Sequence, residues 1–360
     1  RDLRSGALSV LSGSGGFRRR TVRAGGGKRL VMDVVQFITR IIDRVSAENL
    51  VAAGLLFATA FGCALIAYLR TAERYSFAEF FEFALPHEVM THPSARADLL
   101  FYVTRKAIMP FLLIPAGVTF VVAVGYATNR VLGALFGIDQ PIFGEPGPVT
   151  VVLFTLTMLL AYDLSYYLYH TAQHRYPFLW ELHKVHHSAE VMVGITKDRV
   201  HPLDELMNRA WDGVIPGICF GIWSLLALNP VELTVFGINV YIMRNILMMD
   251  FVRHTHFKIS FGRLNAVILC PHWHQLHHST APQHYDKNFG LLFSFWDRLF
   301  GTLHVPEPNE DFTFGLVDRD VADYQSLSGL YVLPLKKMGR RIARQVRRLR
   351  GIPAQPRSGA

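Results

Sequence analysis

The apolar stretches of this chain are long enough to cross a lipid bilayer, and they limit its fold more than any other feature. A helix needs about 20 apolar residues to span the hydrocarbon core. The first such stretch is LVAAGLLFATAFGCALIAYL at 50–69, the second runs over 108–137, and the third is VTVVLFTLTMLLAYDLSYYL at 149–168. Two more stretches, 213–228 and 233–249, are separated by NPVE and predict a helical hairpin.

The composition agrees with a membrane protein that has polar ends. Of the 360 residues, 51% are hydrophobic and 18% are charged, below the roughly 25% that is usual in soluble domains. Much of the net charge of +9 lies in two runs, RRRTVRAGGGKR near the start and KKMGRRIARQVRRLRG near the end. Each run fits a solvated face or a contact with an anionic membrane surface, and the second has apolar residues at helical spacing. Nucleic-acid binding is the least favoured interpretation.

Cysteine usage and the N-terminal region add little chemistry. The cysteines Cys63, Cys219 and Cys270 are far apart in apolar surroundings, so we expect neither a disulfide framework nor thiolate metal ligands. Residues 1–30 are rich in Arg, Gly and Ser, and we assign them no structure. An amphipathic segment with Val35, Ile38, Ile42 and Val45 on one face precedes the first apolar stretch, and residues 70–107 are predicted to be interfacial.

The hairpin decides which segments share a compartment. Because it would leave the membrane on the side it entered, residues 169–212 and the chain from 250 onward would face the same side. Lys and Arg flank this side, whereas the loop IDQPIFGEPGP before the third stretch has neither. The positive-inside rule therefore places this side in the cytoplasm. The same count would put the basic N-terminus outside, so the first stretch is predicted to be re-entrant or its tail to be unusual.

Histidines gather on this side in short repeated words. Twelve of the sixteen histidines fall between 170 and 278. The words are HTAQH at 170–174, HKVHH at 183–187, RHTH at 253–256 and PHWHQLHH at 271–278, with a single histidine in RVHPLDE at 199–205. On a helix, positions i, i+3 and i+4 share one face, so HxxxH and HxxHH point two and three imidazoles at one place.

So many convergent imidazoles predict a site that binds more than one metal ion. One ion takes three to six donors, and the words offer at least nine, which suits two ions. Few carboxylates lie nearby, which disfavours Ca²⁺ and Mg²⁺, whereas imidazole suits iron, zinc, copper and nickel. Two adjacent iron ions with open positions could activate O₂.

Other histidines have plainer interpretations, and two carboxylates are candidate supports. His87, His92, His284 and His304 are interpreted as interfacial or hydrogen-bonded, and His256 and His272 as extras beside better-placed neighbours. Asp163 lies seven residues before His170 on nearly the same helix face, where it could accept an imidazole N–H. Asp204, near His201, could do the same, or lie in a solvated loop. Tyr166, Tyr167 and Tyr169 are interpreted as an interfacial aromatic belt.

Together these words resemble the fatty acid hydroxylase / sterol desaturase superfamily. Beyond the histidines, the run YDLSYYLYHTAQHRYPFLWELHKVHHS, the segment RVHPLDE and the closing elements NFG at 288–290 and WDRLFGT at 296–302 are similar to that family. The resemblance covers roughly residues 148–305 and implies an all-α, multipass membrane helical bundle with a cytosolic histidine-rich helical cap. The sequence departs from the pattern at His256 and Phe289, and neither change removes a ligand. The resemblance implies a non-haem di-iron centre, O₂ as co-substrate, and these metal ligands: His170, His174, His183, His186, His187, His201, His254, His274, His277 and His278, supported by Asp163 and Asp204.

The implied chemistry is O₂-dependent attack on a C–H bond of a membrane lipid, by hydroxylation or desaturation. The lipid could be a sterol, a fatty acyl chain or a related molecule. A fused cytochrome b5 domain would carry a His–Pro–Gly–Gly string, which is absent, so the electrons are expected from an external ferredoxin, cytochrome or reductase.

Three other classes are less consistent with the pattern. A membrane haem protein that transfers electrons would need single histidines facing each other across helices. A zinc hydrolase would need fewer ligands and a glutamate base, as in HExxH, and a transporter would place its ligands near mid-membrane. A metal-free scaffold would not need every histidine word. We therefore expect four regions: a basic tail and amphipathic segment at 1–49, a transmembrane and interfacial region at 50–147, the hydroxylase/desaturase domain at 148–305 and a basic tail at 306–360.

Overall fold

The structure is a computed structural model that is mostly helical in the residues it describes. These are residue 51 and residues 54–231, 233–235, 238–240, 249–307, 310–317 and 321–351, with backbone only for 110–119 and 234–239. The chain divides into two compact units, residues 1–51 and 52–360, and nearly all described residues belong to the second unit. The predicted basic tail and amphipathic segment at 1–49 lie outside the described residues.

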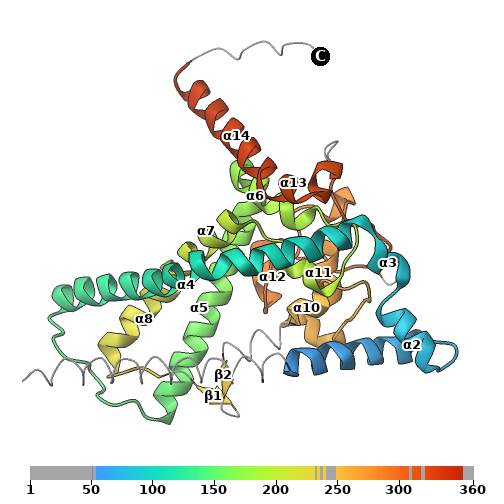
Figure 1. Ribbon diagram of the computed structural model, residues 1–360. Coiled ribbons are helices and arrows are strands. Elements are labelled where there is room, and N and C mark those ends of the chain that lie inside the picture. The colour runs from blue at the N-terminus through green and yellow to red at the C-terminus, as the bar shows by residue number, and fades with distance from the viewer. Residues whose placement is uncertain are drawn as a thin grey trace, which may run out of the picture. The chain divides into compact units, whose positions relative to one another are not determined.

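Figure 1 shows the arrangement of the elements. After a helix at Gly54–Thr71 come α2 (Phe77–Ala84), α3 (His87–Thr91), α4 (Pro93–Phe136), α5 (Pro148–Arg175), α6 (Pro177–His187), the 3₁₀ helix η1 (Gly194–Asp198), α7 (Pro202–Asp212) and α8 (Val214–Leu226). A two-stranded antiparallel ladder, β1 (Thr234–Val235) and β2 (Ile238–Asn239), follows, with Thr234 opposite Asn239. The remainder comprises α10 (Asp250–Arg253), η2 (Gly262–Ala266), α11 (Pro271–His277), η3 (Pro282–His284), α12 (Phe295–Phe300), η4 (Val321–Gln325), α13 (Leu327–Tyr331) and α14 (Leu333–Leu349).

Two of the described helices are long and apolar enough to cross a membrane, Gly54–Thr71 and α5. Both coincide with predicted stretches. Helix α5 begins at Pro148, whose fixed φ suits a first turn, and ends before Pro177, which disfavours helix at the preceding residue. The predicted stretch at 108–137 forms the second part of α4.

The predicted hairpin is not confirmed. Its first arm forms α8, which has 13 residues, or about 20 Å at about 1.5 Å per residue, short of a hydrocarbon core of about 30 Å. Its second arm, 233–249, lies largely outside the described residues. The multipass topology and the cytoplasmic side of the histidines therefore stay predictions.

Close backbone packing holds α8 against α4. A Cβ at Gly217 would lie 2.8 Å from the Cβ of Val124, and one at Gly221 would lie 2.4 Å from the carbonyl oxygen of Gly125. These distances are shorter than atoms can approach, so only glycine fits at either position. Small residues one turn apart let two helix backbones approach in this way, as in packed membrane helices.

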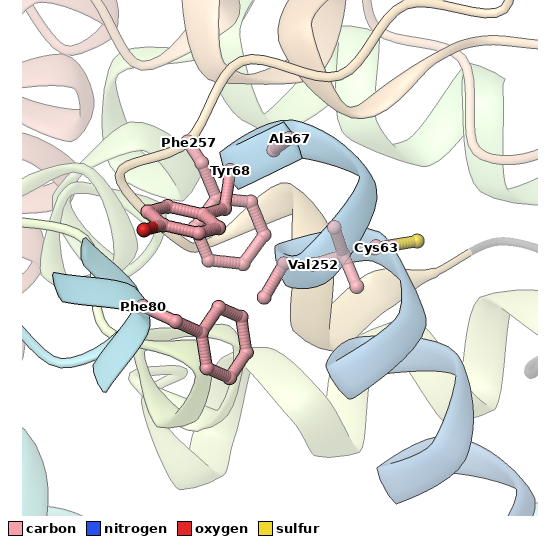
Figure 2. Close-up of a cluster of buried hydrophobic side chains, with 7 residues drawn as sticks. Cys63, Ala67, Tyr68, Phe80, Val252 and Phe257 are labelled. Carbon is pink, nitrogen blue, oxygen red and sulfur yellow. The ribbon is translucent and has the colours of Figure 1, made fainter. Parts of the chain in front are cut away.

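The helix Gly54–Thr71 is anchored to the rest of its unit by an aromatic cluster. Figure 2 shows Cys63, Ala67 and Tyr68 of this helix beside Phe80 of α2 and beside Val252 and Phe257 from the chain around α10. The rings of Tyr68 and Phe80 meet edge to face with centroids 5.6 Å apart, a geometry that contributes beyond simple burial. This cluster ties the first apolar helix to the segment that carries His254.

A buried arginine joins the elements around α6. The Arg199 side chain is fully buried, and its Nη1 lies 2.8 Å from Oδ1 of Asp98 on α4. Its other nitrogens donate to the carbonyl oxygens of Val185 on α6 and Tyr324 on η4. One side chain therefore fixes α4, α6 and the C-terminal segment together, and α14 then packs beside α6 and extends away from it (Figure 1).

Candidate metal centre

Nine histidines converge on two adjacent places in the described part of the chain. In each group, one ring nitrogen per residue lies within 4.8 Å of the others. The five-histidine group comprises His170, His174, His183, His187 and His277. The four-histidine group comprises His186, His254, His274 and His278. Nine of the ten ligands predicted from the sequence are therefore brought together, and whether they bind metal stays a prediction.

The two HxxHH words each supply both groups. On α6, His183 and His187 are four residues apart and belong to the five-histidine group, whereas His186 belongs to the other. The second word is reversed, because His274 and His278 enter the four-histidine group and His277 enters the five-histidine group. Residues i and i+4 share one line along a helix, and i+3 is rotated to its side. The spacing therefore builds two neighbouring sites from one pair of helical turns.

The ε nitrogens of these rings approach one another at distances that suit shared metal ions. His174 Nε2 lies 3.2 Å from His187 Nε2 in the first group. In the second group, His254 Nε2 lies 3.3 Å from His186 Nε2 and 3.2 Å from His274 Nε2. Metal–nitrogen bonds of about 2.1 Å place neighbouring donors about 3.0–3.4 Å apart at octahedral to tetrahedral angles.

Backbone carbonyl groups fix the tautomers of two rings in the five-histidine group and of one ring in the four-histidine group. Nδ1 of His170 lies 2.9 Å from the carbonyl oxygen of Phe289, and Nδ1 of His277 lies 2.7 Å from that of Lys287. Nδ1 of His254 lies 2.8 Å from the carbonyl oxygen of Asp250. A carbonyl only accepts, so each Nδ1 is the donor and each Nε2 carries a lone pair.

Hydrogen bonds between the rings cannot give every ring nitrogen in these groups a partner. The single Nε2 lone pair of His254 cannot accept well from both His186 and His274, which approach it from two sides. Nε2 of His170 and Nε2 of His277 are buried without a hydrogen-bond partner. Buried polar atoms without partners are costly, and a metal ion would satisfy all of them. The residues present therefore fit two metal ions.

The electrostatics also keep these rings neutral. Burial, together with the neighbouring imidazoles, holds the pKa values of His186, His187, His274 and His278 well below the usual value for histidine. Burial lowers the pKa of His277 to about 3. Neutral imidazole is the form that binds metal, so the site is prepared for ligation at neutral pH.

Asp163 supports the site in a different way from the one predicted. It lies fully buried on α5, and its carboxylate accepts the backbone N–H groups of Leu292 and Phe293 and the indole N–H of Trp296. The partner of His170 is instead the Phe289 carbonyl. The Asp163 carboxylate therefore holds the backbone at Leu292 and Phe293. These residues closely follow Phe289, whose carbonyl group contacts His170.

A second carboxylate holds the same turn. Oδ1 of Asp297 accepts from the backbone N–H of Phe289 at 2.8 Å, and Oδ2 accepts from that of Gly290 at 2.8 Å. Thr302 donates to the same carboxylate at 2.7 Å. The closing elements NFG and WDRLFGT thus form one hydrogen-bonded unit, and Asp297 is a supporting residue that the sequence reasoning did not identify.

Asp204, which the sequence places near His201, lies close to His183 in the structure. Its Oδ2 is 3.4 Å from Nδ1 of His183, and its Oδ1 accepts from Gln173 at 2.6 Å and from the hydroxyl of Tyr169 at 3.1 Å. The carboxylate is buried, so this contact is shielded from solvent. Asp204 therefore lies beside His183, a member of the five-histidine group.

His201, the tenth predicted ligand, lies outside both groups. Its Nδ1 accepts the backbone N–H of Leu203 at 3.1 Å and so caps α7. Its Nε2 lies 3.0 Å from the carbonyl oxygen of Tyr331. Both ring nitrogens are therefore committed to the backbone, and we leave His201 out of the proposed ligand set. His256 likewise contacts a carbonyl, that of Phe83.

Two cavities are lined in part by these histidines. One, of about 250 Å³, is lined by His183, His186, His254 and His274, by Tyr162 and Tyr166 of α5, and by charged residues of α7 and α10. The other, of about 300 Å³, is lined by His174, Trp180, His187 and His277. A small molecule or the end of a lipid can thus approach either group.

Comparisons with known proteins find similarity in one segment of the chain. Residues 155–302 match the family described as fatty acid hydroxylase. The chain is 28% identical over 158 residues to alkylglycerol monooxygenase of Caenorhabditis elegans, covering 44% of this chain and 28% of the relative. It is 28% identical over 163 residues to the cholesterol 25-hydroxylase-like protein of Danio rerio, covering 44% of this chain and 59% of the relative. Human cholesterol 25-hydroxylase is 27% identical over 153 residues, which cover 42% of this chain and 51% of that protein.

The matches are partial in both directions. The chain spans between about a quarter and three fifths of the length of these relatives, at 28%, 59% and 51%. No solved structure matches the chain significantly. The comparisons therefore bear on the segment that holds the histidine groups.

Proposed function

We propose that the chain is a membrane-bound di-iron oxygenase of the fatty acid hydroxylase / sterol desaturase superfamily that hydroxylates or desaturates a lipid, because residues 155–302 match the fatty acid hydroxylase family. The observation that carries this proposal is the pair of adjacent histidine groups, with Nε2 atoms 3.2–3.3 Å apart and facing one another. Two ions are needed because the nine rings divide into two sets.

The donor set is consistent with iron, and the relatives named as a monooxygenase and a hydroxylase favour iron over the other candidate metals. All nine donors are imidazoles, which suit iron, zinc, copper or nickel and disfavour hard cations. Iron, when bound in both groups, would supply the binding and activation of O₂. In the described part of the chain, the groups meet where His187 and His278 stack with ring centroids 4.4 Å apart, so the two ions would be neighbours.

The protein's own residues would orient and shield this chemistry. The carbonyl groups of Phe289 and Lys287 hold two rings with Nε2 directed inward. Burial of the four-histidine group, in which no residue is more than 7% exposed, would exclude water from the reacting positions. The 250 Å³ cavity would hold the carbon that reacts, beside Tyr162 and Tyr166 on the candidate membrane-crossing helix α5. A lipid could then enter sideways from the bilayer.

The overall reaction requires a reductant. Hydroxylation consumes a C–H bond, one O₂, two electrons and two protons, and gives an alcohol and one water. Desaturation uses the same reductant and oxidant, and gives an alkene and two waters. We propose an external ferredoxin, cytochrome or reductase as the electron source, with the histidine side in the cytoplasm.

Product analysis tests this proposal. The purified full chain is loaded with Fe(II), supplied with ¹⁸O₂, a reductant and lipid extracts, and the lipids are analysed by mass spectrometry. The candidates to test first are glyceryl ethers and sterols, because relatives are named for alkylglycerol and cholesterol. We expect one ¹⁸O atom in a lipid product, or an alkene two hydrogens lighter, with wild type and with His87→Ala, which changes an exposed residue. Product made equally by His254→Ala would refute the proposal.

A further inference from the structure

A third cluster of metal-binding side chains lies outside the two histidine groups. It consists of His284, His304 and Glu310, whose donor atoms all lie within 4.8 Å of one another. His284 ends the 3₁₀ helix η3, His304 follows α12, and Glu310 lies in the segment beyond it. The sequence pattern alone suggests only ordinary hydrogen bonding for both histidines.

A hydrogen bond accounts for two members of the cluster and leaves the third unexplained. His284 Nε2 contacts Glu310 Oε1 directly, and the His284 side chain is fully buried. His304 Nε2 lies 3.6 Å from Glu310 Oε2, which is too long for a hydrogen bond. The same nitrogen is buried and has no hydrogen-bond partner. A buried ring nitrogen that lies beside a carboxylate without hydrogen-bonding to it requires a reason.

Asn288 holds the backbone of His304 in place. The backbone N–H of His304 donates to Oδ1 of Asn288 at 2.8 Å, and the backbone carbonyl of His304 accepts from Nδ2 of Asn288 at 2.9 Å. Asn288 itself is fixed in the left-handed region with φ of 56°. The backbone that carries the His304 ring is therefore held by two hydrogen bonds to one side chain. The rings of His284 and His304 lie with their centroids 5.0 Å apart and their planes at 64°.

We propose that His284, His304 and Glu310 bind a third divalent ion, for which zinc is the best match. Two imidazoles and one glutamate with a water in the fourth position form a recurrent zinc site. Zinc–ligand bonds of about 2.0–2.2 Å place neighbouring donors about 3–3.5 Å apart, close to the 3.6 Å between His304 and Glu310. The ion would satisfy the unpaired nitrogen.

The carboxylate is ready for this role. Partial burial raises the pKa of Glu310, but the neighbouring His284, the backbone N–H of Glu307 and His304 together outweigh it and lower the pKa to about 2. The backbone N–H of Glu307 donates to Oε2 of Glu310 at 3.1 Å, which fixes its orientation. Glu310 is thus ionised at neutral pH and held in place without the ion.

The proposed ion has a defined consequence for the neighbouring centre. It would join the segment 304–310 to the turn 284–289, and this turn supplies the Lys287 and Phe289 carbonyls that orient His277 and His170. The ion would therefore act as a clamp behind the five-histidine group. This role does not depend on which metal the two histidine groups hold.

Metal counting with matched variants tests the site. The full chain in detergent is stripped with a chelator, loaded with Zn(II), desalted and analysed by element-resolved mass spectrometry. We expect Glu310→Gln and His304→Asn each to hold one zinc equivalent fewer than wild type. Glu88→Gln, the same substitution at an exposed carboxylate of α3, is expected to hold the wild-type number.

A thermal readout complements the count. Zinc added to the stripped protein is expected to raise the melting temperature of wild type and Glu88→Gln more than that of Glu310→Gln or His304→Asn. Because the His304 side chain is 26% exposed, His304→Asn decides the matter if Glu310→Gln does not fold. Equal zinc counts in wild type and His304→Asn would overturn the proposal.

Discussion

Asp163 is the position where one atom replacement should affect both stability and metal binding. Its carboxylate accepts three N–H groups, from Leu292 N at 2.9 Å, Phe293 N at 3.1 Å and Trp296 Nε1 at 3.0 Å. The first goes to Oδ1 and the other two to Oδ2. Asp163→Asn keeps the shape of the side chain but replaces one oxygen by a donor.

The structure sets the expected cost. In its better orientation the new amide keeps its oxygen for Phe293 and Trp296, and turns its NH₂ toward the N–H of Leu292. One hydrogen bond to a charged group, worth about 1.5–3 kcal/mol, is lost, and a buried donor is left unpaired. We expect Asp163→Asn to lower the free energy of unfolding by about 3 kcal/mol. The turn would then hold the Phe289 carbonyl less firmly against His170, and loss of such support typically weakens metal affinity about 10–100-fold.

The assay combines thermal melting in detergent with iron titration of the stripped protein. Asp139→Asn is the matched control, because Asp139 is exposed and the substitution is chemically the same. The control should melt and bind iron like wild type, whereas Asp163→Asn should melt earlier and bind one iron more weakly. Equal melting temperatures and equal iron affinities for the two variants would contradict this role of Asp163.

Three further predictions follow from the fold and the buried charges. Arg199→Ala leaves the buried Asp98 without its ion pair, and should destabilise the chain by about 3–5 kcal/mol, measured by melting; an unchanged melting temperature would contradict the interlocking role. Gly221→Ala places a Cβ 2.4 Å from the Gly125 carbonyl oxygen and should cost about 1–3 kcal/mol, whereas Gly62→Ala, with open space at its Cβ, should not lower the melting temperature. The metal-free protein should lose stability as pH falls below about 6.5. Burial holds the folded-state pKa values of the histidines below that of the unfolded chain, so the unfolded state binds more protons there. A melting temperature that stays constant from pH 7.5 to pH 5 would contradict this sign.

Local helix geometry made the histidine ligands predictable from the sequence. HxxxH and HxxHH need only the helical repeat to converge, and the eight predicted histidines in these words do so in the described residues, where His254 joins them from a separate segment. The division of each HxxHH word between two groups was not predicted, because it depends on how α6 and α11 face each other.

Other features depend on partners far along the chain. His201 has the spacing of a ligand but contacts the carbonyl of Tyr331, and Asp163 contacts a turn about 130 residues away. Tyr167 and Tyr169, interpreted as an interfacial belt, are buried, and their hydroxyls contact Thr302 and Asp204. Their true contacts could not be read from periodicity, because long-range pairing decides them.

The predicted spans show the limit of hydropathy. Stretch 149–168 became the core of α5, since an uninterrupted apolar run with prolines at its borders leaves few alternatives. Stretch 213–228 has similar hydrophobicity, but its helix ends at Leu226. Its glycines are used for close packing on α4, which composition alone does not reveal.

The central claim is that the two histidine groups hold two irons. The most direct measurement is the iron content per chain of protein loaded anaerobically with Fe(II), together with its ultraviolet–visible spectrum. We expect two irons and no haem Soret band in wild type, and one iron in His254→Ala, which loses a ligand from the four-histidine group only. One iron or none in wild type, or a Soret band, would contradict it.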